Sequence, residues 1–133
     1  MATFNLEIVT PQRLFYRGQV ESLRAPGVMG SFGVLARHIP FMTALTAGEI
    51  IIRGPEGVRY VAISGGFLEV LKTGVTVLAE TAEFAEEIDR TRAERAQDRA
   101  KERLRQRHSE IDRTRAEAAL ARAVVRLRVT QRM

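Results

Sequence analysis

The sequence predicts an N-terminal antiparallel β-sandwich of about ten short strands, followed by a C-terminal antiparallel hairpin of two helices. All 10 glycines lie at or before Gly74 and all 4 prolines at or before Pro55, so turn-forming residues stop partway along the chain. Before that point short apolar runs recur roughly every ten residues, and beyond it alanine and leucine recur at helical spacing. The two predicted domains span residues 1–84 and 85–133.

The strands are expected where β-branched and aromatic residues run between turn signals. A proline begins the first turn at Pro11-Gln12-Arg13, and the clearest hairpin turns are Gly54-Pro55-Glu56-Gly57 and Lys72-Thr73-Gly74. The predicted strands cover residues 3–9, 14–20, 21–25, 30–35, 42–46, 48–53, 58–63, 66–71 and 75–80.

Each helix is predicted from one row of small apolar residues with offsets of three and four. The first row is Ala93, Ala96, Ala100 and Leu104, and the second is Ala116, Leu120, Ala123 and Leu127. Only Arg107 and His108 remain to connect the helices, which should therefore fold back on each other. Alanine rows bury little surface, and at about 25 cal/mol per Å² the pair should be weak enough to open.

An octapeptide, Glu-Ile-Asp-Arg-Thr-Arg-Ala-Glu, occurs twice, at residues 87–94 and 110–117. The second copy follows Ser109, the expected N-cap of the second helix, with Asp112 three residues later. In the first copy Asp89 could itself be an N-cap. Such a string can thus begin a helix for structural reasons alone, and no ligand is assigned to the second copy.

Arginines accompany both rows of small residues. In an antiparallel pair, residues rotated the same way from each row share a face, so Arg92 and Arg99 are expected to approach Arg122 and Arg126. Like charges on neighbouring turns repel, so the closed hairpin should favour an anion on this face. A solvated basic stripe is the structural alternative, and these residues alone do not decide between the two.

Composition limits the function classes. The net charge of +5 combines 21 basic with 16 acidic residues, which is a milder bias than duplex-binding proteins usually carry. There are no cysteines and only two histidines, which excludes disulfides and thiolate or histidine-rich metal sites. No apolar run reaches the length of a membrane span, and no signal segment opens the chain, so we expect a protein of cytosolic origin.

The first domain offers no catalytic pattern. Glu49, Glu56 and Glu69 sit at turns or in strands without a shared spacing, and His38 is expected to support a proline turn. Ser64-Gly65-Gly66 lacks the lysine that a phosphate-binding loop would need, so it is interpreted as a bulge or a close backbone approach.

Two stretches carry a resemblance to a known family. Residues 30–41, Gly-Ser-Phe-Gly-Val-Leu-Ala-Arg-His-Ile-Pro-Phe, and residues 61–70, Val-Ala-Ile-Ser-Gly-Gly-Phe-Leu-Glu-Val, followed by 75–80, resemble the signatures of the ε subunit of bacterial F-type ATP synthase. The resemblance covers the full length, including a β-sandwich and a helical hairpin. It implies a non-catalytic rotor subunit that couples proton-driven rotation to ATP synthesis.

The same resemblance implies partners and a location. The sandwich would contact the γ subunit and the ring of c subunits, and the extended hairpin would reach the α/β hexamer and block ATP hydrolysis. Folded down, the hairpin would lie against the sandwich. The protein would be peripheral to the cell membrane on its cytoplasmic side, without inserting into the bilayer.

Some family members bind ATP on the closed hairpin through an Ile/Leu-Asp-x-x-Arg-Ala motif, which residues 88–93 match in full. By resemblance, Asp89 would hold the adenine side, with Ile88 and Ala93 as apolar walls, and Arg92, Arg99, Arg122 and Arg126 would hold ribose or phosphates. Glu83 completes the set. ATP would be a regulatory ligand, with or without magnesium, that keeps the hairpin closed.

Other readings remain. The hairpin of the same rotor subunit need not sense ATP at all. A nucleic-acid-binding module would use the helix arginines on phosphates, although interleaved glutamates and the lack of stacking aromatics in the tail disfavour it. A nucleotide-hydrolysing enzyme would need a base and a metal-binding carboxylate pair near the arginines, and the sequence supplies no evident pair.

Overall fold

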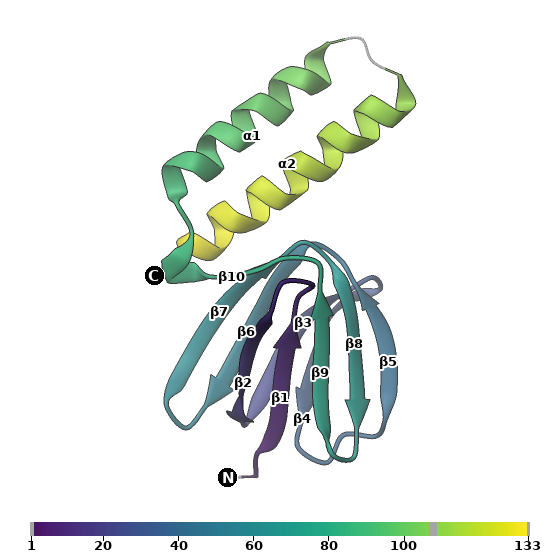
Figure 1. The fold of residues 1–133 in the computed structure, drawn as a ribbon, viewed down its shortest axis with the longest axis vertical. Helices are drawn as coiled ribbons and strands as arrows, with labels where there is room; N and C mark the ends of the chain where they lie inside the picture. Colours follow the sequence, from purple (N-terminus) through teal and green to yellow (C-terminus); the bar gives the residue numbers. More distant parts are fainter. Residues whose placement is uncertain (1, 107–108, 133) are drawn as a thin grey trace.

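The computed structural model describes residues 2–106 and 109–132. Over these residues the chain forms a ten-stranded sheet folded into a sandwich, with a helical hairpin standing above one end (Figure 1). The strands are β1 Phe4–Val9, β2 Leu14–Val20, β3 Ser22–Gly27, β4 Gly30–Leu35, β5 Phe41–Leu45, β6 Gly48–Gly54, β7 Gly57–Ile63, β8 Gly66–Leu71, β9 Gly74–Ala79 and β10 Ala82–Phe84. A 3₁₀ turn, η1 Ala85–Glu87, leads to α1 Arg90–Arg105 and α2 Glu110–Thr130.

The sheet follows the order β10-β7-β6-β3-β5-β8-β9-β1-β2, and β4 pairs with β3 beside this path. Neighbouring strands are antiparallel except β1 and β9, which are parallel, with Leu6 opposite Val75. The predicted sandwich and hairpin are confirmed, and within residues 2–106 and 109–132 this parallel pair departs from the expected antiparallel pairing. Parallel pairing needs a long connection, and here the other strands of the sandwich provide it.

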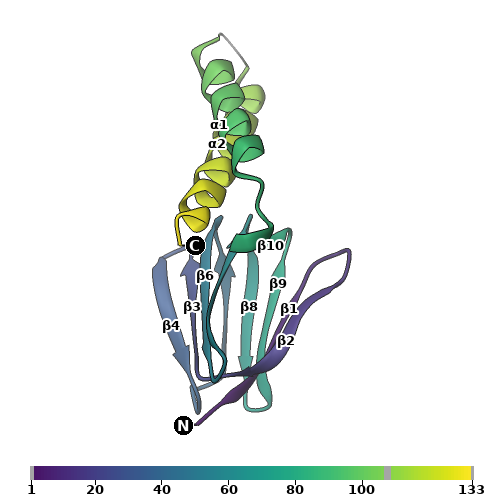
Figure 2. The same cartoon turned by 90° about the vertical axis from the view of Figure 1, so that its left-hand side faces the viewer.

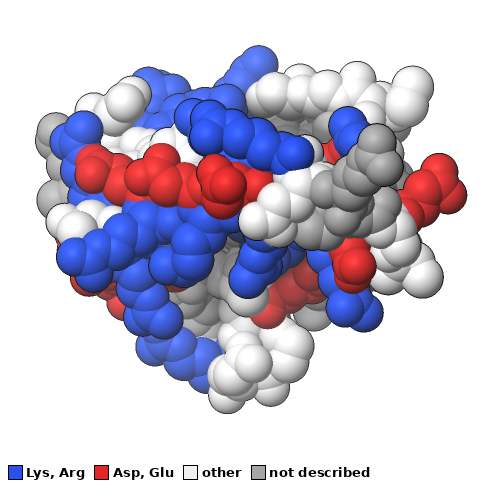
Figure 3. All heavy atoms as spheres, turned by 90° about the horizontal axis from the view of Figure 1, so that it is seen from above, with Lys and Arg blue, Asp and Glu red and all other residues white. Residues whose placement is uncertain are grey.

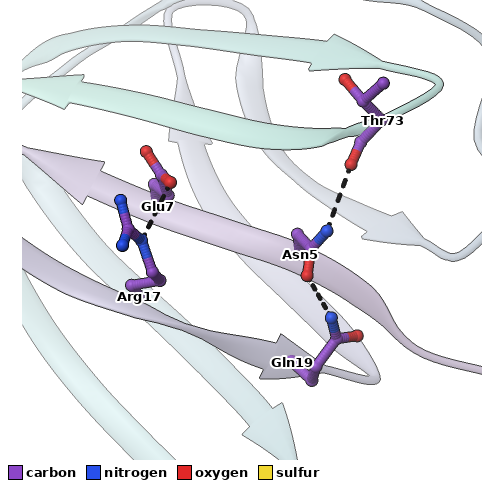
Figure 4. Close-up of polar contacts among 5 residues, drawn as sticks. All are labelled: Asn5, Glu7, Arg17, Gln19 and Thr73. Atoms are coloured by element: carbon purple, nitrogen blue, oxygen red, sulfur yellow. Dashed lines mark hydrogen bonds and ion pairs between the residues drawn. The ribbon is translucent and has the colours of Figure 1, made fainter.

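Polar side chains tie β1 to both of its neighbours (Figure 4). Asn5 on β1 accepts a hydrogen bond from Gln19 on β2 and donates one of 3.4 Å to the carbonyl of Thr73 in the β8–β9 turn. Arg17 on β2 pairs with Glu7 on β1 at 3.0 Å. These contacts hold the first hairpin in register along the sandwich edge.

The sandwich core comes from alternate residues of the strands, because successive side chains of a strand point to opposite faces. Fully buried examples are Leu6 and Ile8 on β1, Ile50 on β6, Leu68 on β8 and Val77 on β9. This alternation is what the sequence predicted, and most predicted strand ends agree within one or two residues. The short strand β10 was not predicted, since three residues carry no alternation to detect.

The helices pack along the predicted rows. Ala93 and Ala100 of α1 and Ala116 and Ala123 of α2 are buried. Both N-caps are also confirmed: Asp89 accepts the backbone N–H of Arg92 at 3.0 Å, and Ser109 accepts that of Asp112 at 3.3 Å. The expected connection at Arg107 and His108 lies outside the described residues.

Over the described residues, the base of the hairpin makes its main contact with the sandwich (Figure 2). The last turns of α2 place Val125 and Val129 in a second apolar cluster with Ala62, Ala85 and Ile88. Figure 1 shows both helices rising away from the sheet beyond this contact. The hairpin is therefore folded on itself, and it stands on the sandwich instead of lying along it.

Candidate functional site

A cavity of about 310 Å³ lies where the base of the hairpin meets the sandwich. The sandwich contributes the end of β7, the loop after it and the turn into β10, and the hairpin contributes two arginines one helical turn apart. The lining residues are Ala62, Ile63, Ser64, Thr81, Glu83, Arg122 and Arg126. Because the walls come from two domains, this cavity exists only while the hairpin is docked.

Short-range structure fixes Glu83 in the wall. It lies on β10 opposite Ala62 of β7, and the next residue, Phe84, stacks on Phe15 with ring centroids 4.4 Å apart. The guanidinium of Arg59 covers the Phe84 ring at 3.6 Å. Since neighbouring strand residues face opposite ways, anchoring Phe84 on the core turns Glu83 towards the hairpin.

Glu83 and Arg126 form the main polar contact across the domain junction. The Nε atom of Arg126 lies 2.8 Å from Oε1 of Glu83, and Nη2 donates to Oε2 at 3.1 Å. Their side chains are only 35% and 26% exposed, so the pair is partly shielded from water. Nε itself is buried and makes no hydrogen bond within the described chain, although it is at ion-pair distance. The carboxylate thus leaves hydrogen-bonding capacity of Arg126 unused.

Arg122 lines the same cavity one turn earlier on α2, at an exposed position. No ion pair or hydrogen bond joins its guanidinium to any other described residue. The cavity therefore holds two guanidinium groups and one carboxylate, an excess of one positive charge. A guanidinium without an acidic partner at the mouth of a cavity is suited to an anion such as phosphate.

Three of the predicted ligand residues, Ile88, Asp89 and Ala93, lie at the start of α1 and do not line this cavity. Asp89 caps the helix, as the structural alternative proposed. Ile88 is 9% exposed and Ala93 is fully buried, and both belong to the second apolar cluster with Val125 and Val129. In this arrangement Ile88 and Ala93 stabilise the domain junction through apolar packing.

Arg92 and Arg99 are exposed on α1 and likewise stand outside the cavity lining. Seen from above, basic side chains cover much of the hairpin end, with acidic side chains in a row between them (Figure 3). Of the eight predicted ligand residues, the structure thus brings three together in this cavity: Glu83, Arg122 and Arg126. That all eight meet one ligand remains a prediction.

Sequence reasoning missed Ser64 and Thr81. The hydroxyl of Thr81 lies 2.8 Å from that of Ser64, and the Ser64 backbone N–H donates to the Thr81 carbonyl at 3.4 Å. From its sequence, Ser64-Gly65-Gly66 is not predicted to bind phosphate, because it lacks the lysine of a phosphate-binding loop. The fold supplies basic groups there from α2, which local sequence could not reveal.

Further charged contacts surround the junction. Arg59 pairs with Glu86 at 2.6 Å, and a backbone hydrogen bond together with this guanidinium lowers the pKa of Glu86. Arg132, just beyond α2, makes two hydrogen bonds to Glu49 on β6, which raise the pKa of Arg132. The first pair joins β7 to η1 and the second joins the residues after α2 to β6, and neither pair lines the cavity.

Two sandwich residues that the sequence offered as possible catalytic groups, Glu49 and His38, make structural contacts instead. Glu49 is the partner of Arg132, and the His38 ring packs against Phe41 with centroids 5.0 Å apart. Across residues 2–106 and 109–132, no three acidic or histidine side chains gather in a way that could hold a metal ion. Within the same ranges, neither helix combines the length and apolar character needed to cross a bilayer.

Comparison with known families gives two adjoining matches. A profile of the family described as ATP synthase, Delta/Epsilon chain, beta-sandwich domain matches residues 3–85. A profile of the ATP synthase, Delta/Epsilon chain, long alpha-helix domain matches residues 86–131. Together they cover both parts of the fold.

Individual proteins are also similar. An ATP synthase epsilon chain of Nitratidesulfovibrio vulgaris strain DP4 is 50% identical over 104 residues, covering 78% of each chain. One from Moorella thermoacetica is 49% identical over 108 residues, covering 80% of this chain and 81% of the relative.

Solved structures agree with the fold. A chain in the Euglena gracilis mitochondrial ATP synthase, in a structure of OSCP, F1 and the c-ring, aligns with a TM-score of 0.81 and 26% identity. The alignment covers 91% of this chain and 77% of that one. A chain from the central stalk and c-ring of the Tetrahymena thermophila enzyme aligns with a TM-score of 0.69 at 14% identity, a likeness of fold.

Proposed function

This chain belongs to the ATP synthase delta/epsilon chain family, and from that premise we propose that ATP bound at the junction of its two domains keeps its hairpin closed. At the coarser level it is an epsilon subunit of the central stalk of the F-type enzyme, a stalk component rather than a catalytic one. The proposal concerns what this subunit does there: it couples rotation to ATP synthesis, and its extended hairpin inhibits ATP hydrolysis.

The partners follow from the assemblies in which similar chains occur. Two structural neighbours belong to assemblies that contain the c-ring together with F1 or with the central stalk. We propose that the sandwich binds the γ subunit and the c-ring, and that the extended hairpin reaches the α/β hexamer. The subunit would then be peripheral to the cell membrane, on the cytoplasmic side.

The observation that carries the ATP proposal is the charge balance of the junction cavity. Glu83 neutralises one guanidinium, and Arg122 remains without an acidic partner in the described chain. A polyphosphate would supply the missing negative charge, and Glu83 would remain as an acceptor for donor groups on the ligand. Both domains would contact the same molecule.

A ligand held by both domains selects the closed form. If ATP binds only that form, it stabilises it by RT ln(1 + [L]/Kd), which is about 2.7 kcal/mol at a hundredfold excess over Kd. The alanine rows make the helix pair weak enough for such a bias to matter. Abundant ATP would keep the inhibitory hairpin folded, and scarce ATP would release it.

Titration calorimetry on the full chain tests this proposal, with and without magnesium. Wild-type protein should bind ATP, and Arg122→Ala should weaken binding by about tenfold or more because a charge-assisted contact is lost. Arg128→Ala is the matched control, since Arg128 is exposed on α2 and does not line the cavity. Equal ATP affinity in the wild type and both variants would contradict the assignment of the site.

The proposal that the extended hairpin inhibits ATP hydrolysis has to be tested in the assembled synthase. The chain has no cysteines, so Glu49→Cys with Arg132→Cys can be joined by a bifunctional thiol reagent that a reductant cleaves. Joining them should prevent inhibition of ATP hydrolysis at low ATP, and reductant should restore it. Hydrolysis that does not respond to the cross-link would argue against a hairpin that opens to inhibit.

A further inference from the structure

We infer that the Ser64 hydroxyl is a phosphate ligand of the junction cavity, so that the Ser64-Gly65 loop of the sandwich and the arginines of α2 together form one phosphate site. This inference rests on the proposed ATP function and adds to it a contact from the sandwich. It assigns a role to a segment that its own sequence gave no reason to call phosphate-binding.

Proton counting supports the inference first. Ser64 and Thr81 carry one hydroxyl proton each, and their 2.8 Å hydrogen bond uses one of the two. Whichever hydroxyl donates in that bond, the other proton remains available. Both residues line the cavity, so a free hydroxyl donor lies in the same space as Arg122 and Arg126.

The free donor belongs to Ser64 when Thr81 donates in the 2.8 Å bond, and the greater burial of Ser64 favours it as the hydroxyl that faces a bound ligand. Ser64 is half-buried, whereas Thr81 is exposed. The Ser64 backbone is also held, since its N–H donates to Thr81 and the next residue, Gly65, accepts from the Glu80 N–H at 3.0 Å. The donor is therefore presented from a fixed loop, which lowers the ordering cost of binding.

The electrostatic setting selects an acceptor-rich ligand. The same cavity is lined by α2, whose two guanidinium groups exceed the single Glu83 carboxylate. Phosphate oxygens accept hydrogen bonds from hydroxyl and guanidinium groups alike. A phosphate bound here would contact both α2 and the loop that follows β7. It would therefore have to dissociate before α2 could move away from the sandwich.

Gly65 sets the shape of the loop that follows Ser64. Its φ is +127°, and an added Cβ would stand 3.4 Å from the Leu45 carbonyl oxygen. A glycine therefore turns the chain immediately after Ser64. The resulting site resembles a phosphate-binding loop in its serine and glycine, with its basic residues provided by a different domain.

The test is titration of the full chain with ATP and with inorganic tripolyphosphate, combined with thermal melting of the ligand-free protein. Ser64→Ala should bind both about tenfold more weakly than the wild type. Ser64→Thr keeps the hydroxyl and should bind within about threefold of the wild type. Thr81→Val breaks the hydroxyl pair but leaves the Ser64 proton, so it should melt earlier and still bind ATP.

The variants separate a ligand contact from a structural tie. If the hydroxyl pair only holds two turns together, Ser64→Ala and Thr81→Val will have the same effect on ATP affinity, and the inference is overturned. Unchanged tripolyphosphate binding in Ser64→Ala overturns the phosphate assignment. Absence of ATP binding by the wild type removes the proposed function as well, whereas wild-type binding with an unaffected Ser64→Ala removes this inference alone.

Discussion

Arg132 makes two hydrogen bonds to Glu49, which lies 83 positions earlier in the sequence: Nε donates to Oε2 at 3.1 Å and Nη2 donates to Oε1 at 3.0 Å. The Glu49 side chain is only 10% exposed, and the Arg132 guanidinium also lies 5.3 Å from the centre of the Tyr60 ring. This pair fastens the base of α2 to β6 outside the junction cavity. One polar contact that docks the hairpin therefore lies apart from the cavity, whereas the Glu83–Arg126 contact belongs to it.

Arg132→Ala should loosen the base of the hairpin, because it leaves the nearly buried Glu49 carboxylate without its partner. Hydrogen exchange of backbone amides in the last two turns of α2 should become faster, while exchange in the core strands stays the same. Arg128→Ala, at an exposed position of the same turns, is the control. Unchanged exchange in Arg132→Ala would mean that the apolar cluster alone holds the base.

Ala100→Leu should force the two helices apart, since Ala100 is 2% exposed in the seam of the hairpin. Overpacking at such a position costs about 1–3 kcal/mol. Urea unfolding followed by circular dichroism would show the loss of helix at lower denaturant. Ala118→Leu makes the same change at an exposed position of α2 and should leave the midpoint nearly unaltered. Equal midpoints for the two variants would contradict the close approach of the helices.

Gly66→Ala, at the start of β8, should destabilise the sandwich. An added Cβ would lie 1.9 Å from the Leu78 carbonyl oxygen, and the φ of Gly66 is +151°. Backbone strain and displacement together should cost more than about 2 kcal/mol, measured as a lower melting temperature. At Gly33 the nearest atom would be 3.8 Å away, so Gly33→Ala is the control. A normal melting temperature for Gly66→Ala would refute this close approach.

Acid should weaken the β7–η1 contact through Glu86. Its own backbone hydrogen bond and the Arg59 guanidinium lower the pKa of Glu86 below the ordinary 4.5. The folded state therefore favours the charged form. The resulting stability is fully present above pH 4.5 and is lost as the pH falls through the lowered value.

Urea midpoints measured between about pH 3 and pH 6 test this contribution. Glu86→Gln should make the acid side of the profile flatter than in the wild type. The effect should be small and should shrink in salt, because the Arg59 and Glu86 side chains are 44% and 52% exposed. Glu56→Gln, at an exposed position of the β6–β7 turn, should leave the slope unaltered. A steeper acid slope in Glu86→Gln would reverse the assignment.

The elements themselves were predictable because their signals are local. Glycine and proline placed the turns, and alternation located strands such as β4, whose bounds Gly30–Leu35 agree with the prediction. The alanine rows identified the buried faces of both helices, and Ser109 marked the start of α2. The sequence did not predict the strand β10 or the docking role of Val125 and Val129, because the residues that they contact lie on other elements.

By itself, the sequence determined the sandwich, the hairpin and the family, since these follow from short-range periodicity and from contiguous motifs. Only the tertiary structure decided which charges meet: Glu83 and Arg126 are 43 positions apart, and Glu49 and Arg132 are 83 apart. No periodicity links residues at such separations, and their contact depends on how the base of α2 docks. That docking places Arg122 and Arg126 beside Ser64, a juxtaposition that neither segment encodes alone.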